Sequence, residues 1–307
     1  MANTPLRSQL HVDQLLSNVA VKYQNTRFIH TEVFPMVPVL KTSDLYRTYN
    51  RNWVIPETNR AIGGLAKEHL FEIGNSNYSL EKHALKSYVA DTAADNYDIT
   101  DLRADVTIDL TEKIMMRKEA ACAALFTTTQ WSLGVSLAVG DQWDSGTALP
   151  INLFDTAGSS IVQASGVKSN FAIIPLDAYN KLKNHTTVVD RVKYTSRELS
   201  PAIVGALIGM ENLLVPDINY DAGLYGASAA TGAVRSIWNA KDVFVGYKPS
   251  SAGFYALSSG YMFQKNKPLV RRWREEEREA DAIELDCEFQ FKVVASLSGY
   301  FIKAVIA

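Results

Sequence analysis

The sequence predicts a mixed α+β chain, and three patterns carry this prediction. Apolar residues recur at helical spacing over residues 98 to about 129, and helix and short-strand patterns alternate over residues 150 to 265. Residues 280–295 alternate between apolar and polar side chains, as in a strand with one buried face. We therefore expect a long helix, an α/β core and antiparallel strands.

Composition argues against several classes of protein. The 31 Lys and Arg stand against 33 Asp and Glu, and a net charge of −2 is not that of a strongly basic nucleic-acid-binding protein. The chain shows no signal-peptide pattern and no apolar run long enough to span a membrane. Its cysteines, Cys122 and Cys287, lack the spacing of zinc ligands. We expect free thiols, a cytoplasm-like environment, and no metal or cofactor.

The segment of residues 98–129 is the clearest predicted helix. Asp98 or Thr100 can cap its start, and acidic residues precede basic ones, as the helix dipole favours. About 30 residues would give a helix of roughly 45 Å, which suggests a structural spine. Its apolar stripe comprises Leu102, Val106, Leu110, Ile114, Ala121 and Leu125.

Two segments before this helix have little material for a core. Residues 1 to about 35 are typical of an arm with one short amphipathic helix, followed by "FPMVPV", whose prolines favour an extended, non-central strand. Residues 40–90 predict a long hairpin with a bend at Gly63 and Gly64. An isolated two-stranded ribbon is marginal in water, so something outside it must hold it. The apolar residues of the arm are Leu10, Val12, Leu15, Leu16, Val19 and Val21.

The α/β core is predicted from local signals. "NLFDTAGSSIVQAS" and "LDAYNKLKNH" predict helices, the first closed by Gly166, and "LSPAIVGALIGM" predicts a helix capped by Ser200 with Pro201 in its first turn. The Gly/Ala stretch "YDAGLYGASAATGAV" is a mobile loop by composition. Strands are expected at "NFAIIP", "LLVPDI", "DVFVGY" and, at the C-terminal end, "GYFIKAVIA".

A search for catalytic patterns finds none of the common nucleophile, phosphate-binding or zinc motifs. The five histidines lack metal-like spacing, although His69 and His83 could meet across the hairpin. Asp141, Asp144 and Asp155 are more typical of turns than of a carboxylate site. We therefore expect that the protein is not an enzyme.

Two charged or aromatic stretches are candidate contact surfaces. "YRTYNRNW", residues 46–53, could stack on bases, form an exposed ribbon face, or contact another chain; we favour contact, because Tyr, Trp and Arg are enriched at binding hot spots. In "RRWREEERE", residues 271–279, four Arg nearly balance four Glu, which fits either a self-paired surface or salt bridges to a neighbouring chain. The candidates for such salt bridges are Arg271, Arg272, Arg274, Glu275, Glu276 and Glu277.

The order of these parts resembles tailed-bacteriophage major capsid proteins of the HK97-like fold. The resemblance rests on "FPMVPV", "VIPETNRAIGG", "RKEAACAALF", "INLFDTAGSSI", "NFAIIPLDAYNKLKNH" and "LSPAIVGALIGMENLLV", in that order over nearly the whole chain. It implies an N-terminal arm at 1–39, an extended loop (E-loop) at 40–90, a peripheral (P) domain at 91–144 and 266–307 with the spine helix and antiparallel strands, and an α/β axial (A) domain at 145–265.

The resemblance also implies a role and partners. Such chains form hexamers and pentamers of an icosahedral virion shell around double-stranded DNA, without sequence-specific binding, and assemble in the bacterial cytoplasm. The E-loop lies over the adjacent subunit, which makes Arg51, Trp53, Arg60 and Lys67 intersubunit contact candidates. The short arm implies a separate scaffolding protein, besides a portal and a possible decoration protein. Lys67 and Asn59 give no basis for a covalent crosslink. The alternatives are an encapsulin-like nanocompartment and a cytosolic α/β hydrolase.

Overall fold

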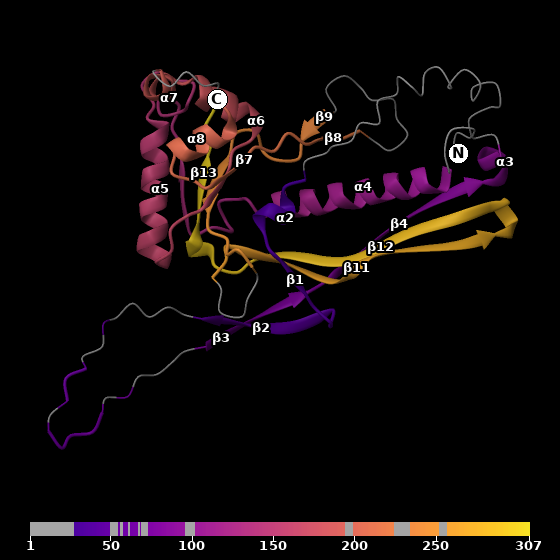
Figure 1. The fold of residues 1–307 in the computed structure, drawn as a ribbon, viewed down its shortest axis with the longest axis horizontal. Helices are drawn as coiled ribbons and strands as arrows, with labels where there is room; N and C mark the ends of the chain where they lie inside the picture. Colours follow the sequence, from indigo (N-terminus) through magenta and orange to yellow (C-terminus); the bar gives the residue numbers. More distant parts are fainter. Residues whose placement is uncertain are drawn as a thin grey trace.

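A computed structural model shows an α/β block at one end, from which a long helix and a sheet extend side by side (Figure 1). A separate hairpin projects away from both, beyond the compact part of the molecule. None of the helices in the described part of the chain is long and apolar enough to cross a membrane. The structure describes residues 28–49, 55, 58–60, 62–66, 68, 73–95, 102–193, 199–223, 234–251 and 257–307.

The extended sheet has four strands in the order β1-β11-β12-β4. β1 is parallel to β11, and the other neighbours are antiparallel. The strand predicted over residues 280–295 is confirmed, and its apolar positions are largely buried. The expected exposure of its other face is wrong, because Asp286 is buried as well. β1 is the expected extended edge strand. The bounds are β1 Met36–Pro38, β4 Glu81–Ala90, β11 Gly260–Glu275 and β12 Ala280–Val293.

The charged stretch of residues 271–279 belongs to this sheet. β11 continues to Glu275, and a short 3-10 turn, η1 (Glu276–Arg278), connects it to β12. The sequence pattern does not predict a strand here, because charged side chains on both faces hide the period of two. The stretch therefore forms the end of a long β-hairpin.

The predicted spine is α4, Leu102–Ala123, which lies along the sheet against β4 and β12 (Figure 1). It is shorter than the predicted 98–129, and 22 residues give a length of about 33 Å. Leu110, Ile114 and Cys122 face the core, as the apolar stripe requires. Asp98 and Thr100, the expected caps, lie outside the described residues. A shorter helix, α3 (Asp91–Asp95), follows β4.

The α/β block contains the second sheet, with strand order β5-β13-β10-β6-β7. The predicted closure of α5 at Gly166 is confirmed by its left-handed backbone, with φ of 67°. Ser200 does precede α8, but its side chain makes no capping hydrogen bond, contrary to prediction. The bounds are β5 Leu133–Ser136, α5 Pro150–Ser165, β6 Phe171–Ile173, α6 Leu176–Asn184, α7 Thr186–Val192, α8 Pro201–Leu207, β7 Asn212–Leu214, β10 Val243–Gly246, η2 Ser296–Ser298 and β13 Gly299–Lys303.

The final strand corrects the expected grouping of the C-terminal strands. β13 does not pair with β12; it runs antiparallel to β10 and parallel to β5 in the second sheet. The chain thus crosses from one sheet to the other at Gly299, where an added Cβ would lie 2.4 Å from Phe244 and 2.6 Å from Trp131. Only glycine allows this close approach of the strand to two aromatic rings.

The projecting hairpin pairs β2 (Ser43–Tyr49) with β3 (Ile73–Ser79). It is shorter than the expected 40–90, because residues 81–90 form β4 and pair with β12. Another small hairpin pairs β8 (Asn219–Asp221) with β9 (Val234–Ser236). These two strands flank the Gly/Ala stretch, whose central residues lie outside the described part of the chain. The short helix α2, His30–Val33, precedes β1.

We predict that Leu110→Pro prevents correct folding. The proline removes a backbone hydrogen bond in the middle of α4 and clashes with the preceding turn, which costs roughly 3 kcal/mol or more. Urea denaturation of any soluble fraction measures the loss. Exposed Ile108→Ala on the same helix is the control and should change stability by less than about 0.5 kcal/mol. A soluble Leu110→Pro protein of unchanged stability would contradict the continuous helix.

Candidate assembly surfaces

The base of the projecting hairpin is fixed to the first sheet by aromatic packing. The rings of Tyr46 and Tyr78, one from each strand, pack against Phe263 of β11 with centroid distances of 5.4 and 4.8 Å. The backbone N–H of Ser79 also donates to Gln290 Oε1 at 2.8 Å. These contacts hold the hairpin at its base, so its direction is set by the sheet.

The tip of the hairpin has apolar side chains without cover. Ile55, Ile62 and Leu65 each have more than nine-tenths of their surface exposed. Gly63 has a positive φ of 82°, which confirms the predicted bend. Exposed Arg60, a predicted contact residue, donates from Nε to the carbonyl of Gly64 at 2.5 Å. The other predicted contact residues of this loop, Arg51, Trp53 and Lys67, lie outside the described residues.

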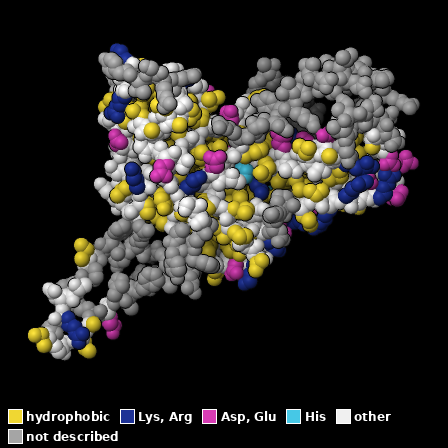
Figure 2. Space-filling view, in the orientation of Figure 1, with side chains coloured by type: hydrophobic (Ala, Val, Ile, Leu, Met, Phe, Trp, Pro, Cys, Tyr) yellow, Lys and Arg dark blue, Asp and Glu magenta, His cyan; other side chains and the backbone are white. Residues whose placement is uncertain are grey.

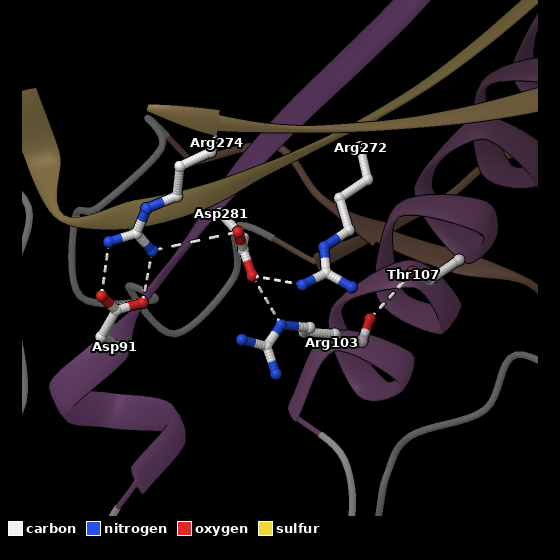
Figure 3. Close-up of polar contacts among 6 residues, drawn as sticks. All are labelled: Asp91, Arg103, Thr107, Arg272, Arg274 and Asp281. Carbon is white, nitrogen blue, oxygen red and sulfur yellow. Dashed lines mark hydrogen bonds and ion pairs between the residues drawn. The ribbon is translucent and has the colours of Figure 1, made fainter. Parts of the chain in front are cut away.

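The far end of the first sheet carries a network of ion pairs within the chain (Figure 3). Asp281 of β12 accepts hydrogen bonds from Arg103 Nε of α4 and Arg272 Nη2 of β11, each at 2.7 Å. Arg274 binds both carboxylate oxygens of Asp91 at 2.6 Å. The network therefore joins α3 and α4 to strands β11 and β12. Two of the predicted intersubunit residues, Arg272 and Arg274, thus have partners in their own chain.

These contacts shift the titration of the groups involved. The hydrogen bond from Arg103, helped by Arg272, holds the pKa of Asp281 below its ordinary value, although partial burial works in the opposite direction. The guanidinium of Arg274 likewise lowers the pKa of Asp91, and Asp91 in turn raises the pKa of Arg274. Both carboxylates are therefore fully charged at neutral pH.

The remaining predicted salt-bridge residues are paired more loosely. Arg271 lies 3.3 Å from Asp286, and Glu275 lies 3.8 Å from Lys86. Glu276 is 4.0 Å from Arg274 and 87% exposed, and Glu277 has no ion pair within the described part of the chain. Arg272 and Arg274 are thus paired within the chain, as one of the two interpretations predicts. Salt bridges from the other residues to a neighbouring chain stay a prediction.

Cationic and aromatic side chains gather beside this end of the sheet. Lys86 Nζ lies 4.7 Å from the ring centre of Tyr88 and 5.4 Å from that of Trp273. The guanidinium of Arg278 lies 4.4 Å from the ring of Tyr88. Figure 2 shows acidic side chains at the extreme end of the molecule with basic ones next to them. Such a surface has both signs of charge and partly exposed aromatic rings.

A buried carboxylate that sequence analysis missed joins three parts of the chain. Glu119 of α4 accepts hydrogen bonds from His30 Nδ1 at 2.8 Å, the His30 backbone N–H at 3.0 Å and Trp238 Nε1 at 2.7 Å. Its neighbour Lys118, also buried, instead donates to Gln264 Oε1 of β11 at 2.9 Å. The sequence held a signal for the burial of Lys118, because this residue continues the four-residue spacing from Ile114 to Cys122.

A groove of about 1390 Å³ lies along α4. Its lining comes from α4, β4, the β8 region and the segment before β10. Lys113 and Arg117 stand exposed on α4 at its rim, and neither has a carboxylate within ion-pair distance in the described ranges. The apolar lining residues are Leu85, Leu110, Met116, Ala120, Ala123, Ala124, Phe126, Ile237 and Phe301.

No family model matches the chain. Two curated proteins, both named major capsid protein, are similar to it in sequence. That of Burkholderia phage BcepMu is 22% identical over 305 residues, which cover 96% of each chain. That of Pseudomonas phage JBD67 is 26% identical over 198 residues, which cover 62% of this chain and 60% of the relative. The chain is a relative of phage major capsid proteins.

Solved structures agree on the fold. A phage-related protein from Bordetella bronchiseptica matches with a TM-score of 0.73 and 21% identity over 95% of this chain and 97% of the other. The capsid of the cyanophage P-SCSP1u matches with a TM-score of 0.60 and 9% identity, covering 88% and 85%. An encapsulin from Synechococcus elongatus matches with a TM-score of 0.53 and 11% identity, covering 100% and 98%. The mixed α/β fold is therefore that of the HK97-like capsid proteins.

We predict that Asp281→Asn lowers stability in a pH-dependent way. Because the pKa of Asp281 is depressed in the folded chain, its stabilising effect is fully present above its ordinary pKa of 3.8 and is lost as pH falls through the folded value. Urea denaturation from neutral to acidic pH should show wild type more stable at neutral pH, with the gap closing in acid. Exposed Glu277→Gln is the control and should show no such gap. A pH-independent difference for Asp281→Asn would contradict the ion-pair role.

Proposed function

We propose that this protein is a major capsid protein of a tailed bacteriophage, and that it self-assembles as hexamers and pentamers into an icosahedral shell around double-stranded DNA. The observation that carries the proposal is sequence similarity to a phage major capsid protein over 96% of both chains. The protein is accordingly a virion component, with no catalytic residues and no cofactor. Its net charge of −2 suits a shell that must not hold the packaged DNA tightly.

The projecting hairpin supplies a physical reason for assembly. Two-stranded ribbons are marginal in water, and the described residues of this one pack on the first sheet at the base, around Tyr261 and Phe263. Its tip exposes Ile55, Ile62 and Leu65. Apolar side chains that project this far from a core are typical of contact surfaces. We propose that the hairpin is the E-loop and that its tip packs on the adjacent subunit.

The proposed regions follow the two sheets. The N-terminal arm comprises residues 1–39, and the E-loop lies within 40–80, since residues 81–90 pair with the first sheet. The P domain contains α4 and strands β11, β12 and β4, and β1 of the arm lies at the edge of their sheet. The A domain contains the α/β block of 145–259, together with β5 and β13, because both strands belong to its sheet.

The end of the P-domain sheet is a second proposed contact. Arg272 and Arg274 serve the internal network, which leaves Arg271, Glu276 and Glu277 as the residues available to a neighbouring copy. Acidic residues at the extreme end and basic ones beside them would let equivalent ends of several copies attract one another. Exposed ion pairs contribute little energy, so this contact would set orientation more than affinity.

Further partners are inferred from the role. A separate scaffolding protein would guide assembly, a portal would occupy one vertex, and a decoration protein could bind the finished shell; assembly would take place in the bacterial cytoplasm. The encapsulin-like alternative has one supporting observation, the encapsulin among the structural neighbours. It differs in content, because such a shell would enclose protein and not DNA.

Electron microscopy and sedimentation of the purified protein test the proposal. Closed, uniform shells, or capsomers when closure is blocked, are expected. A stable 34.0 kDa monomer whose hairpin is protected from proteases would contradict it. Nucleic acid and protein analysis of shells from infected cells separates the two alternatives. DNA supports the phage capsid, and a packed enzyme without DNA supports the nanocompartment.

We predict that Trp53→Ala and Arg60→Ala weaken the shell without unfolding the subunit. A buried aromatic or Arg contact to a neighbour contributes about 2 kcal/mol or more, and the loss repeats at every symmetric copy. Circular dichroism should stay native, while sedimentation should shift from shells to smaller species. Glu68→Ala, in the same loop, is the control. Shells of both variants that resist heat as well as wild type would exclude the tip as an intersubunit anchor.

A further inference from the structure

A short segment, residues 28–34, lies where the spine, the extended sheet and the α/β block meet (Figure 1). It comprises α2 and the residues on either side of it, and we call it the strap. Ile29, His30, Val33 and Phe34 each have at most 5% of their surface exposed. A segment this short becomes so deeply buried by lying between larger parts of the fold, and its contacts show which parts it links.

Glu119 of α4 binds the strap to the spine. Its Oε2 accepts hydrogen bonds from His30 Nδ1 at 2.8 Å and from the His30 N–H at 3.0 Å, and its Oε1 accepts from the Ile29 N–H at 3.3 Å. Oε1 also accepts from Trp238 Nε1 of the α/β block at 2.7 Å. One buried carboxylate is therefore shared between the strap and the block. Since a buried charge that loses a donor is costly, each partner helps to keep Glu119 in place for the other.

The strap also reaches the α/β block without Glu119. Lys248, which follows β10, donates from Nζ to the carbonyl of Glu32. The ring of Phe34 stacks on Phe126 with a centroid distance of 5.8 Å and an interplanar angle of 13°. Phe126 in turn lies 4.8 Å from Phe244 of β10. A polar and an aromatic contact thus join the strap to the block.

β1 continues the strap into the extended sheet. The Met262 N–H donates to the carbonyl of Pro35 at 3.1 Å, and β1 then pairs with β11. An added Cβ on Gly260 would lie 2.6 Å from the Phe34 ring, so the start of β11 and this ring are in close contact. The chain itself crosses between sheet and block after α4, after β10 and after β12. Loops of this kind allow the parts that they join to rotate, and the strap adds a non-covalent constraint on the angle.

One atom of the strap favours its release. His30 Nε2 is buried and has no hydrogen-bond partner in the described part of the chain. A buried polar atom without a partner raises the free energy of the docked strap, and exposure to water would remove that cost. The strap is therefore bound less tightly than its burial alone would give.

We propose that the strap is a releasable element that sets the angle between the α/β block and the extended sheet, and that its detachment lets the block rotate. By linkage, a partner that displaces the strap changes the orientation of the block, and the orientation of the block changes the affinity of the strap for its site. The proposal goes beyond the shell function, because it concerns a motion within one subunit.

Distances between two spin labels test the proposal in the full-length, unassembled protein. Labels at Gln163→Cys on α5 and Glu277→Cys at the end of the sheet report the angle, since both positions are exposed and lie on the two parts. Labelled protein is diluted into unlabelled protein, so that each distance comes from one chain. Protein without added cysteines measures any reaction of the buried Cys122 and Cys287.

Two variants weaken the strap from different sides. Lys248→Met removes its polar contact with the block, and His30→Ala removes its ring from Glu119. Each should broaden the distance distribution at least about twofold while circular dichroism stays native, because the block is freed to rotate. Lys241→Met, at the other end of β10, is the matched control and should keep the wild-type distribution. Wild-type distributions in both strap variants would overturn the proposal.

Hydrogen exchange tests the link through Glu119 separately. Trp238→Phe keeps an aromatic ring but removes the Nε1–H donor to Glu119, so the amides of residues 28–34 should exchange at least about fivefold faster. Trp131→Phe is the matched control, because Trp131 Nε1 donates to the Leu125 carbonyl at 3.1 Å in the same aromatic cluster. Equal acceleration in both variants would indicate general loosening of the core, and the shared carboxylate would then not be the link.

Discussion

The packing of one helix against one strand pair supports most of this molecule. α4 covers β12 and β4, and its buried neighbours Lys118 and Glu119 reach different partners. Lys118 donates to Gln264 of the sheet, and Glu119 accepts hydrogen bonds from His30 and from Trp238, which precedes β10. A buried carboxylate left without donors would be costly, so Glu119 favours the arrangement in which His30 and Trp238 both reach it. The spine thus fixes the sheet, the arm and the α/β block relative to one another.

This rigid centre explains how a chain can carry exposed apolar extensions. The hairpin base is packed on Phe263, so the tip is held away from the core that would otherwise cover it. Ile55, Ile62 and Leu65 at the tip are exposed as a result. The same geometry that makes the isolated subunit look incomplete therefore suits it to a self-assembling shell, where neighbours provide the missing contacts.

The charged end of the sheet contains both residues paired within the chain and residues left in solvent. Asp281 pairs with Arg103 and Arg272, and Asp91 pairs with Arg274. These ion pairs hold α3 and α4 to strands β11 and β12. The outer residues Glu276 and Glu277 remain solvated.

The sequence by itself determined the elements whose signals are local. The four-residue spacing predicted α4, strict alternation predicted β12, and Gly166 marked the end of α5. Each is set by the period or the backbone freedom of neighbouring residues. The order of these elements was also sufficient to indicate the capsid fold.

Only the tertiary structure decided which distant parts meet. It placed β13 in the α/β sheet, moved residues 81–90 from the hairpin to the first sheet, and paired Arg274 with Asp91 and Arg272 with Asp281. It also buried Glu119 beneath His30 and Trp238. Strand alternation says which face of a strand is apolar but not which strand lies beside it, and a charged residue's partner depends on which residues the fold brings near. Those choices are made by packing the whole chain, and they carry no signal in any short stretch of it.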